Sequence, residues 1–234
     1  MRRRTNDAQG FFITFEGPDG SGKTTQSQLL LKHLENEGFE VAWTREPGGT
    51  DLGELIRDVI LHDDRFDDLS PRVEALLLAS ARAQHVNELI RPQLETGKIV
   101  LCDRFTDSTT AYQGGGSGLN IEDMSRLNHF ATGALVPDLV ILLDMPIEDG
   151  LQRKLGENID VSDSLSRIEQ RGLAYHRRVR LQFLNLAARA PARWLVLDGR
   201  LPADELSATI ERHVSKELRK QGKSPTRSNP GRLV

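Results

Sequence analysis

The chain has 234 residues, of which 38% are hydrophobic and 28% charged, a composition typical of a globular protein and not of a disordered one. The formal net charge is −3, but residues 1–10 carry +2 and residues 216–234 carry +5, which leaves −10 on residues 11–215. A folded body this acidic argues against nucleic acid as a partner, because broad nucleic-acid binding requires a basic face.

Short apolar runs alternate with longer amphipathic runs along the chain, which is the pattern of a parallel sheet covered by helices. The expected strands lack polar alternation, as in strands buried on both faces, and are Phe11–Glu16, Glu40–Thr44, Ile99–Cys102, Leu139–Asp144 and Trp194–Leu197. The expected helices are Gly22–Glu37, Asp51–His62, Pro71–Gly97 with a kink or break at Pro92, a stretch from Ile121, Pro146–Leu155, Arg167–Arg189 and a stretch from Pro202. We therefore expect one α/β domain over residues 11–215, between a flexible tail at 1–10 and a basic, disordered tail at 216–234.

Cysteine content and hydropathy indicate the compartment. Cys102 is the only cysteine, which excludes a disulfide framework and a cysteine zinc site. No apolar run approaches the roughly 18 residues that span a bilayer, and Phe11–Phe15 is too short for the apolar core of a signal peptide. We therefore expect a cytoplasmic protein without a membrane partner.

The segment GPDGSGKT at residues 17–24 matches the phosphate-binding pattern GxxxxGK[ST] and lies between an expected strand and an expected helix. Its glycines let the backbone fold tightly, so that N–H groups point at phosphate oxygens next to the positive end of the helix. In such a loop Lys23 reaches the β- and γ-phosphates and the hydroxyl of Thr24 binds Mg²⁺. An ordinary glycine-rich turn is the alternative, but this context favours a nucleoside triphosphate site. The residues expected at the site are Gly17, Pro18, Asp19, Gly20, Ser21, Gly22, Lys23 and Thr24.

Two further segments indicate a second substrate at the same edge of the sheet. Arg45, in TREPGG, follows the second strand and would clamp a phosphate there, with a solvated loop as the alternative. Asp103 and Arg104 follow the third strand as a carboxylate–guanidinium pair, for which a structural ion pair is the alternative. The residues after them lead into GGG at 114–116, which we expect to be flexible. The guanine-reading NKxD string of GTPases is absent from the sequence.

The set GPDGSGKT, TREPGGT, SARAQHV, DRFTDSTTAYQGGG and RIE resembles the bacterial thymidylate kinases, which are P-loop nucleoside monophosphate kinases. The similarity runs from about Phe11 to Arg212 and leaves only the two tails outside. The resemblance implies the transfer of the γ-phosphate of ATP to dTMP with Mg²⁺, giving dTDP for dTTP synthesis. It also implies a P-loop NTPase fold with a five-stranded parallel sheet flanked by helices, a short mobile lid at about residues 153–169, and a homodimer.

The resemblance implies a role for each matching residue. Lys23 would hold the ATP phosphates, Arg104 would contact the transferred phosphoryl group or the dTMP phosphate, and Asp103 would organise Mg²⁺ or orient Arg104. The residues expected to bind dTMP are Asp19 near the sugar or phosphate, Arg45, Leu78, Arg82 at the thymine edge, Arg104, Ser108 and Thr109 near the base, Tyr112 under the deoxyribose, and Gln113.

This chain departs from the family at two places. Leu78 stands where relatives commonly carry a phenylalanine that stacks on the base, so we expect weaker dTMP binding. The stretch 156–166 holds three acids (Glu157, Asp160 and Asp163) and no arginine or lysine, and the family's DRIE is SRIE at 166–169. The remaining lid cations are Arg153, Lys154 and Arg167, of which we expect Arg153 and Arg167 to be catalytic.

Two other functions stay open at this stage. Leu78 favours a kinase for another nucleoside monophosphate, and the phosphate loop alone is also compatible with an ATPase that regulates or binds an acidic partner through the basic tail. We favour a solvated tail, and we expect deletion of residues 217–234 to leave catalysis intact.

Overall fold

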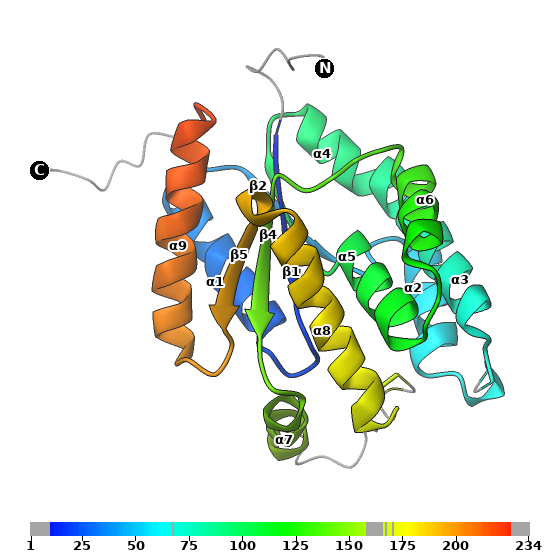
Figure 1. Cartoon of the computed structure of the whole chain (residues 1–234). Coiled ribbons are helices and arrows are strands. Elements are labelled where there is room, and N and C mark those ends of the chain that lie inside the picture. Colours follow the sequence, from blue (N-terminus) through cyan, green and yellow to red (C-terminus); the bar gives the residue numbers. More distant parts are fainter. Residues whose placement is uncertain (1–9, 67, 158–165, 167, 170, 226–234) are drawn as a thin grey trace, which may run out of the picture.

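The computed structural model describes residues 10–66, 68–157, 166, 168–169 and 171–225. Five strands form one parallel sheet in the order β2-β3-β1-β4-β5. They are β1 (Phe11–Glu16), β2 (Val41–Arg45), β3 (Ile99–Asp103), β4 (Leu139–Asp144) and β5 (Trp194–Asp198). Each lies within a residue or so of a strand expected from the sequence, and the expected five-stranded parallel sheet flanked by helices is confirmed (Figure 1).

Helices connect the strands and cover both faces of the sheet. In chain order they are α1 (Lys23–Asn36), α2 (Asp51–Leu61), η1 (Asp64–Phe66), α3 (Pro71–His85), η2 (Val86–Ile90), α4 (Arg91–Glu95), α5 (Thr106–Thr109), η3 (Thr110–Gly116), α6 (Ile121–Thr132), α7 (Ile147–Glu157), α8 (Leu173–Arg189), η4 (Pro191–Arg193) and α9 (Ala203–Lys220). The break expected at Pro92 is the wider turn η2, a π-helix that precedes this proline and accommodates its missing N–H.

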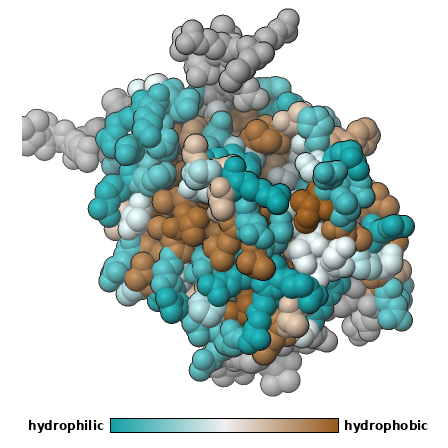
Figure 2. All heavy atoms as spheres, viewed as in Figure 1, coloured by the Kyte–Doolittle hydropathy of each residue, from teal (hydrophilic) through white to brown (hydrophobic). Residues whose placement is uncertain are grey.

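Strand β1 shows how the core is divided between the two faces. All six of its residues are buried, and alternate side chains point to opposite faces. Phe11, Ile13 and Phe15 join the apolar cluster beneath α1 and α9, whereas Phe12 packs with residues of η2 and α4. Figure 1 shows the same division, with α1 and α9 on one side of the sheet and α8, α5 and α6 on the other. The edge strand β5 is less buried than the central strands, since its Val196 is 45% exposed. Figure 2 shows apolar surface over β5 and its neighbours.

The segment expected to be flexible at residues 114–116 is instead the end of helix η3, packed against α8. A side chain could not fit there: a Cβ on Gly115 would lie 2.6 Å from Cβ of Gln182, and one on Gly116 would lie 2.6 Å from the ring of Tyr175. These glycines therefore permit close helix packing, which sequence alone does not distinguish from a flexible loop.

Helix α9 extends past residue 215, where the sequence placed the end of the domain. Leu218 is 1% exposed and belongs to the core cluster beneath α1 and α9. Residues 226–234 and 1–9, parts of the two expected tails, lie outside the described residues. Among the helices that the structure describes, none has the length and apolar character needed to cross a membrane.

The burial of Leu218 changes the expected result of truncation. Deletion of residues 217–234 removes this side chain, whose burial stabilises the fold by about 2 kcal/mol, and should lower Tm by about 5 °C. Deletion of residues 224–234 keeps Leu218 and is the matched control, for which we expect the Tm of the full chain. Thermal unfolding followed by circular dichroism compares the two. Equal Tm values would show that the end of α9 contributes nothing to stability.

Candidate active site

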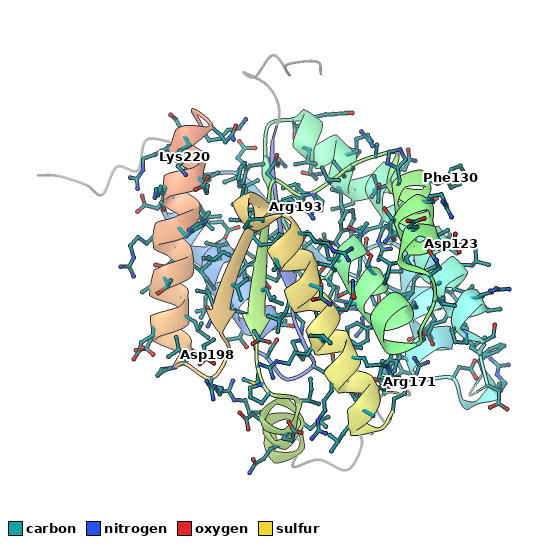
Figure 3. The ribbon with its side chains drawn as sticks, in the orientation of Figure 1. Asp123, Phe130, Arg171, Arg193, Asp198 and Lys220 are labelled. Atoms are coloured by element: carbon teal, nitrogen blue, oxygen red, sulfur yellow. The ribbon has the colours of Figure 1, made fainter. Side chains whose placement is uncertain are left out.

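A cleft of about 850 Å³ opens at the carboxyl edge of the sheet, where the ends of β1, β2 and β3 meet the following loops. Its walls come from the phosphate loop, from α2 and α3, from α5 with η3, and from the loop after β5. Figure 3 labels Asp198, at the end of β5, and Arg171, just before α8, at this edge of the molecule. The cleft thus collects residues from segments that lie far apart in the sequence.

The phosphate loop, residues 17–24, joins β1 to α1. Gly20 has a φ of 75°, and a Cβ there would lie 2.1 Å from the carbonyl oxygen of Gly150, so only glycine fits. Lys23 begins α1 and is buried; its Nζ donates to the carbonyl oxygen of Pro18 at 2.7 Å and to Oγ of Ser21 at 3.4 Å. Burial, and next the charge of Arg104, lower the pKa of Lys23 to about 8.

Thr24 and Asp103 come together beside this loop. The hydroxyl of Thr24 donates to Oδ2 of Asp103 at 2.5 Å, while Oδ1 of Asp103 is buried with no hydrogen-bond partner among the described residues. A hydroxyl oxygen and a free carboxylate oxygen are ligands that suit Mg²⁺, which usually takes one or two carboxylates together with phosphate oxygens and water. Within the described part of the chain no group of three or more His, Cys, Asp or Glu could hold a metal. The pair therefore fits a Mg²⁺ ion shared with a bound nucleotide better than a closed protein site.

Arg104 points back over the phosphate loop. Its guanidinium pairs with Asp19, donates to the carbonyl oxygen of Gly17 at 3.1 Å and to Oγ of Ser108 at 3.2 Å, and lies 5.1 Å from the ring centroid of Tyr112. The hydroxyl of Tyr112 donates to Asp19 at 2.8 Å. The partner of Arg104 in this ion pair is therefore Asp19 and not Asp103, which the sequence offered as an alternative.

Arg82 sits at the base of the cleft in a buried polar network. It is 2% exposed, and it donates to Glu46 at 2.7 Å, to Asn128 at 2.8 Å and to the carbonyl oxygen of Phe105 at 3.2 Å. The other carboxylate oxygen of Glu46 lies 3.0 Å from Nδ1 of His85. This network holds the guanidinium plane of Arg82 in one orientation, as recognition of a ligand edge requires.

A second cationic group lies at the end of β2. Arg45 pairs with Glu54 at 2.8 Å, and its Nε is buried with no hydrogen-bond partner in the described part of the chain. Arg57, on α2, donates to the carbonyl oxygen of Pro47 at 2.9 Å and also lines the cleft. Burial, and next the charge of Arg45, lower the pKa of Arg57. Two neighbouring guanidinium groups favour an anionic ligand, because its charge relieves their repulsion.

The lid is described only in part. The guanidinium of Arg153 donates to the carbonyl oxygens of Gly199 at 2.8 Å and Arg200 at 3.3 Å, in the loop after β5. Ser166 and Glu169 form a reciprocal capping box, in which the Ser166 N–H donates to the Glu169 carboxylate at 2.8 Å and the Glu169 N–H to Oγ of Ser166 at 3.4 Å. Arg167, Asp160, Asp163 and the side chains of Lys154 and Glu157 lie outside the described residues.

Most of the residues predicted from the sequence line this one cleft. They are Asp19, Gly20, Ser21, Gly22, Lys23, Thr24, Arg45, Leu78, Arg82, Asp103, Arg104, Ser108, Thr109, Tyr112, Gln113 and Arg153. Gly17 and Pro18 do not line it, but their carbonyl oxygens accept from Arg104 and Lys23.

The sequence interpretation missed Glu16, Glu46 and Arg57. A charged residue at the end of an apolar strand was a signal for Glu16, and Glu46 lies within the motif that supplied Arg45. No pattern singled out Arg57.

Comparisons with known proteins agree on one family. A family model described as thymidylate kinase matches residues 15–210. A thymidylate kinase of Thermomicrobium roseum is 47% identical over 215 residues, which is 92% of this chain and 99% of that protein. One of Trichormus variabilis is 45% identical over 210 residues, 90% of this chain and 98% of that protein. The crystal structure of thymidylate kinase from Ehrlichia chaffeensis superposes with a TM-score of 0.71 at 31% identity and covers 88% of this chain and 99% of that one.

Proposed function

Because the chain belongs to the thymidylate kinase family, we propose that the cleft at the carboxyl edge of the sheet binds ATP and dTMP together and transfers the γ-phosphate between them. The protein is a phosphotransferase that forms dTDP for dTTP synthesis. The observation that carries the assignment of the site is that one cleft joins the phosphate loop, the Thr24–Asp103 pair and the oriented guanidinium of Arg82.

Phosphoryl transfer needs alignment and charge neutralisation, and no nucleophilic side chain takes part. A phosphate oxygen of dTMP attacks the γ-phosphorus; this P–O bond forms as the bond between the γ-phosphorus and the β-phosphate oxygen breaks. The phosphate-loop amides and Lys23 hold the ATP phosphates, and Arg104 neutralises charge on the transferred group. Thr24 and Asp103 would hold Mg²⁺, which supplies further positive charge at the β- and γ-phosphates when bound.

The remaining residues of the cleft hold the acceptor. Arg45 and, beside it, Arg57 offer positive charge for the dTMP phosphate. Arg82, Ser108, Thr109 and Gln113 provide polar groups for the base, and Leu78 gives an apolar wall. Tyr112 is held by Asp19 at the sugar, where its ring would exclude a 2′-hydroxyl.

A panel of acceptors tests this function. ATP consumption is measured with dTMP, dUMP, dCMP, dGMP and AMP in turn, each with Mg²⁺. We expect rapid consumption with dTMP alone, and formation of dTDP in equal amount. Preference for another monophosphate would favour a different kinase, and hydrolysis independent of any acceptor would favour a regulatory ATPase.

Leu78 provides a test of base recognition. It is half-buried on α3, and it packs against the apolar cluster formed by Ile56, Ile60 and Ala81. Leu78→Phe should lower KM for dTMP by about 2- to 10-fold, because an aromatic ring adds stacking on thymine. Leu181→Phe, at an exposed position of α8, is the matched control. An unchanged or higher KM for Leu78→Phe would place the base elsewhere.

The lid arginines provide a second test. Arg153→Ala and Arg167→Ala should each lower kcat at least about tenfold, through loss of positive charge near the transferred phosphate. Arg189→Ala, at an exposed position at the end of α8, removes the same charge far from the lid and should keep full turnover. Full turnover in both lid variants would show that the lid contributes no catalytic charge.

We also propose that the protein is a cytoplasmic homodimer. Exposed apolar side chains support the dimer. They lie on three neighbouring helices, since α3 packs against both α2 and α6. They are Leu52 and Leu55 on α2, Val73 and Leu76 on α3, and Phe130 on α6. Phe130 is 86% exposed and projects outward from α6 in Figure 3. Apolar surface of this kind is typical of a protein–protein interface.

A further inference from the structure

Glu16 is a buried carboxyl group to which the proposed phosphoryl-transfer mechanism assigns no role. It is the last residue of β1 and is 0% exposed. Its Oε1 accepts the N–H of Phe105 at 2.9 Å, and its Oε2 accepts the hydroxyl of Ser108 at 2.6 Å. Both partners belong to the segment that follows β3 and carries Arg104, so Glu16 joins the strand before the phosphate loop to that segment.

The backbone of Arg104 is in an unfavourable conformation. Its φ is 70°, in the left-handed region that a residue with a Cβ seldom adopts. Among the described residues, the only other non-glycine residue with a positive φ is Ala134. Such a conformation persists only where the surroundings hold it, and it is found at sites where the direction of a side chain matters.

Two hydrogen bonds to β1 hold this turn. The N–H of Arg104 donates to the carbonyl oxygen of Phe15 at 2.9 Å, which is a backbone bond and insensitive to side-chain changes. The next N–H, that of Phe105, donates to the Glu16 carboxyl group. Glu16 also acts on the far end of the arginine, since Ser108, which donates to Glu16, accepts a hydrogen bond from the guanidinium of Arg104 at 3.2 Å.

We propose that Glu16 is the positioning residue for Arg104: by fixing the Phe105 N–H and the Ser108 hydroxyl, it stabilises the left-handed turn and directs the guanidinium to the phosphate loop. This inference rests on the catalytic role proposed above for Arg104. Because Glu16 is fully buried, it offers no surface to a substrate, and it acts on the reaction only through the arginine.

Hydrogen bonding, and not negative charge, is the property of Glu16 that matters here. Burial, and next the charge of Asp107, raise the pKa of Glu16 to about 8, so the neutral acid is favoured at neutral pH. A neutral carboxyl group keeps an oxygen that accepts from the Phe105 N–H. Glutamine has the same shape and the same acceptor, whereas methionine has a similar length and no comparable acceptor.

The experiment measures kcat for dTMP phosphorylation in Glu16→Met and Glu16→Gln, each in the native chain and in an Arg104→Ala background. Glu16→Met should lower kcat about 30-fold in the native chain, because it leaves a buried N–H unpaired beside the arginine. Glu16→Gln should stay within about fivefold of the native kcat. In the Arg104→Ala background, Glu16→Met should lower kcat further by less than about threefold, because its effect passes through the missing side chain.

The outcomes separate this inference from the function on which it rests. A native chain that does not phosphorylate dTMP contradicts the function itself, and an Arg104→Ala variant with full kcat contradicts the role of Arg104 and the inference with it. Losses that multiply in the double variant, or an equal loss in Glu16→Gln and Glu16→Met, overturn the inference alone. Thermal unfolding checks that the variants are folded. If Glu16→Met does not fold, Glu16→Asp replaces it, because its shorter side chain cannot reach both donors.

Discussion

Lys23→Met is expected to lower kcat by about 100- to 1,000-fold, the loss measured when a single preorganised group that stabilises transition-state charge is removed. Lys23 is buried in the phosphate loop, and its Nζ donates hydrogen bonds there to the carbonyl oxygen of Pro18 and to Oγ of Ser21. Methionine has a similar length, so the substitution removes the ammonium group and little of the packing. The measurement is steady-state turnover at saturating ATP, dTMP and Mg²⁺.

Lys32→Met is the matched control for this prediction. Lys32 lies on the same helix, α1, but is exposed to solvent and outside the cleft. The substitution is chemically identical, and we expect native turnover. Similar losses in the two variants would mean that the effect arises from the helix and not from charge at the phosphate loop, and native turnover in Lys23→Met would exclude the loop as the site of catalysis.

The strands were predictable because each is a short apolar run without polar alternation. The ends of the strands were less predictable. Strand β2 runs from Val41 to Arg45, which is one residue later at each end than the expected Glu40–Thr44. Pairing with β3, which joins Arg45 to Asp103, extends β2 by one residue, Arg45, which the sequence interpretation placed in the following loop. The register between strands that are far apart in the chain depends on tertiary contacts, so a local sequence pattern does not predict it.

The helical state of residues 110–116 was not predictable for a similar reason. Three consecutive glycines have low helix propensity, and the sequence favours a flexible segment. Close packing of η3 on α8, which leaves no room for a Cβ at Gly115 or Gly116, outweighs that preference. Tertiary contact with a helix about 60 residues later in the chain decides the structure here.

Within the site, the sequence motifs predicted most of the residues that line the cleft, but they did not predict the partners that hold those residues. Arg82 was expected at the thymine edge, but nothing local indicated that Glu46 and Asn128 hold its guanidinium. Likewise the pairing of Arg104 with Asp19 joins residues 85 positions apart. Recognition of a phosphate or a base restricts which residue types can bind the ligand, so these residues form a motif. Many different partners can hold such residues in place, so the partners form no motif.

Asp103→Asn is expected to lower kcat by about 100-fold and to raise the Mg²⁺ concentration required for half-maximal activity by about 10-fold. Oδ1 of Asp103 is buried and has no hydrogen-bond partner among the described residues, while Oδ2 accepts from Thr24. Asparagine keeps the size of the side chain and one oxygen acceptor, but removes the negative charge that attracts the cation. The measurement is a Mg²⁺ titration of initial rates at fixed ATP and dTMP.

Asp123→Asn provides the matched control, because Asp123 lies on the exposed face of α6, paired with Arg126 and far from the cleft. We expect its Mg²⁺ dependence to equal that of the native chain. A loss of kcat in Asp103→Asn with no change in the Mg²⁺ requirement would assign Asp103 to the orientation of Thr24 and the turn before Arg104. A raised Mg²⁺ concentration for half-maximal activity would instead assign the free carboxylate oxygen to the metal, since the weaker binding that follows loss of a ligand is offset by more of the ion.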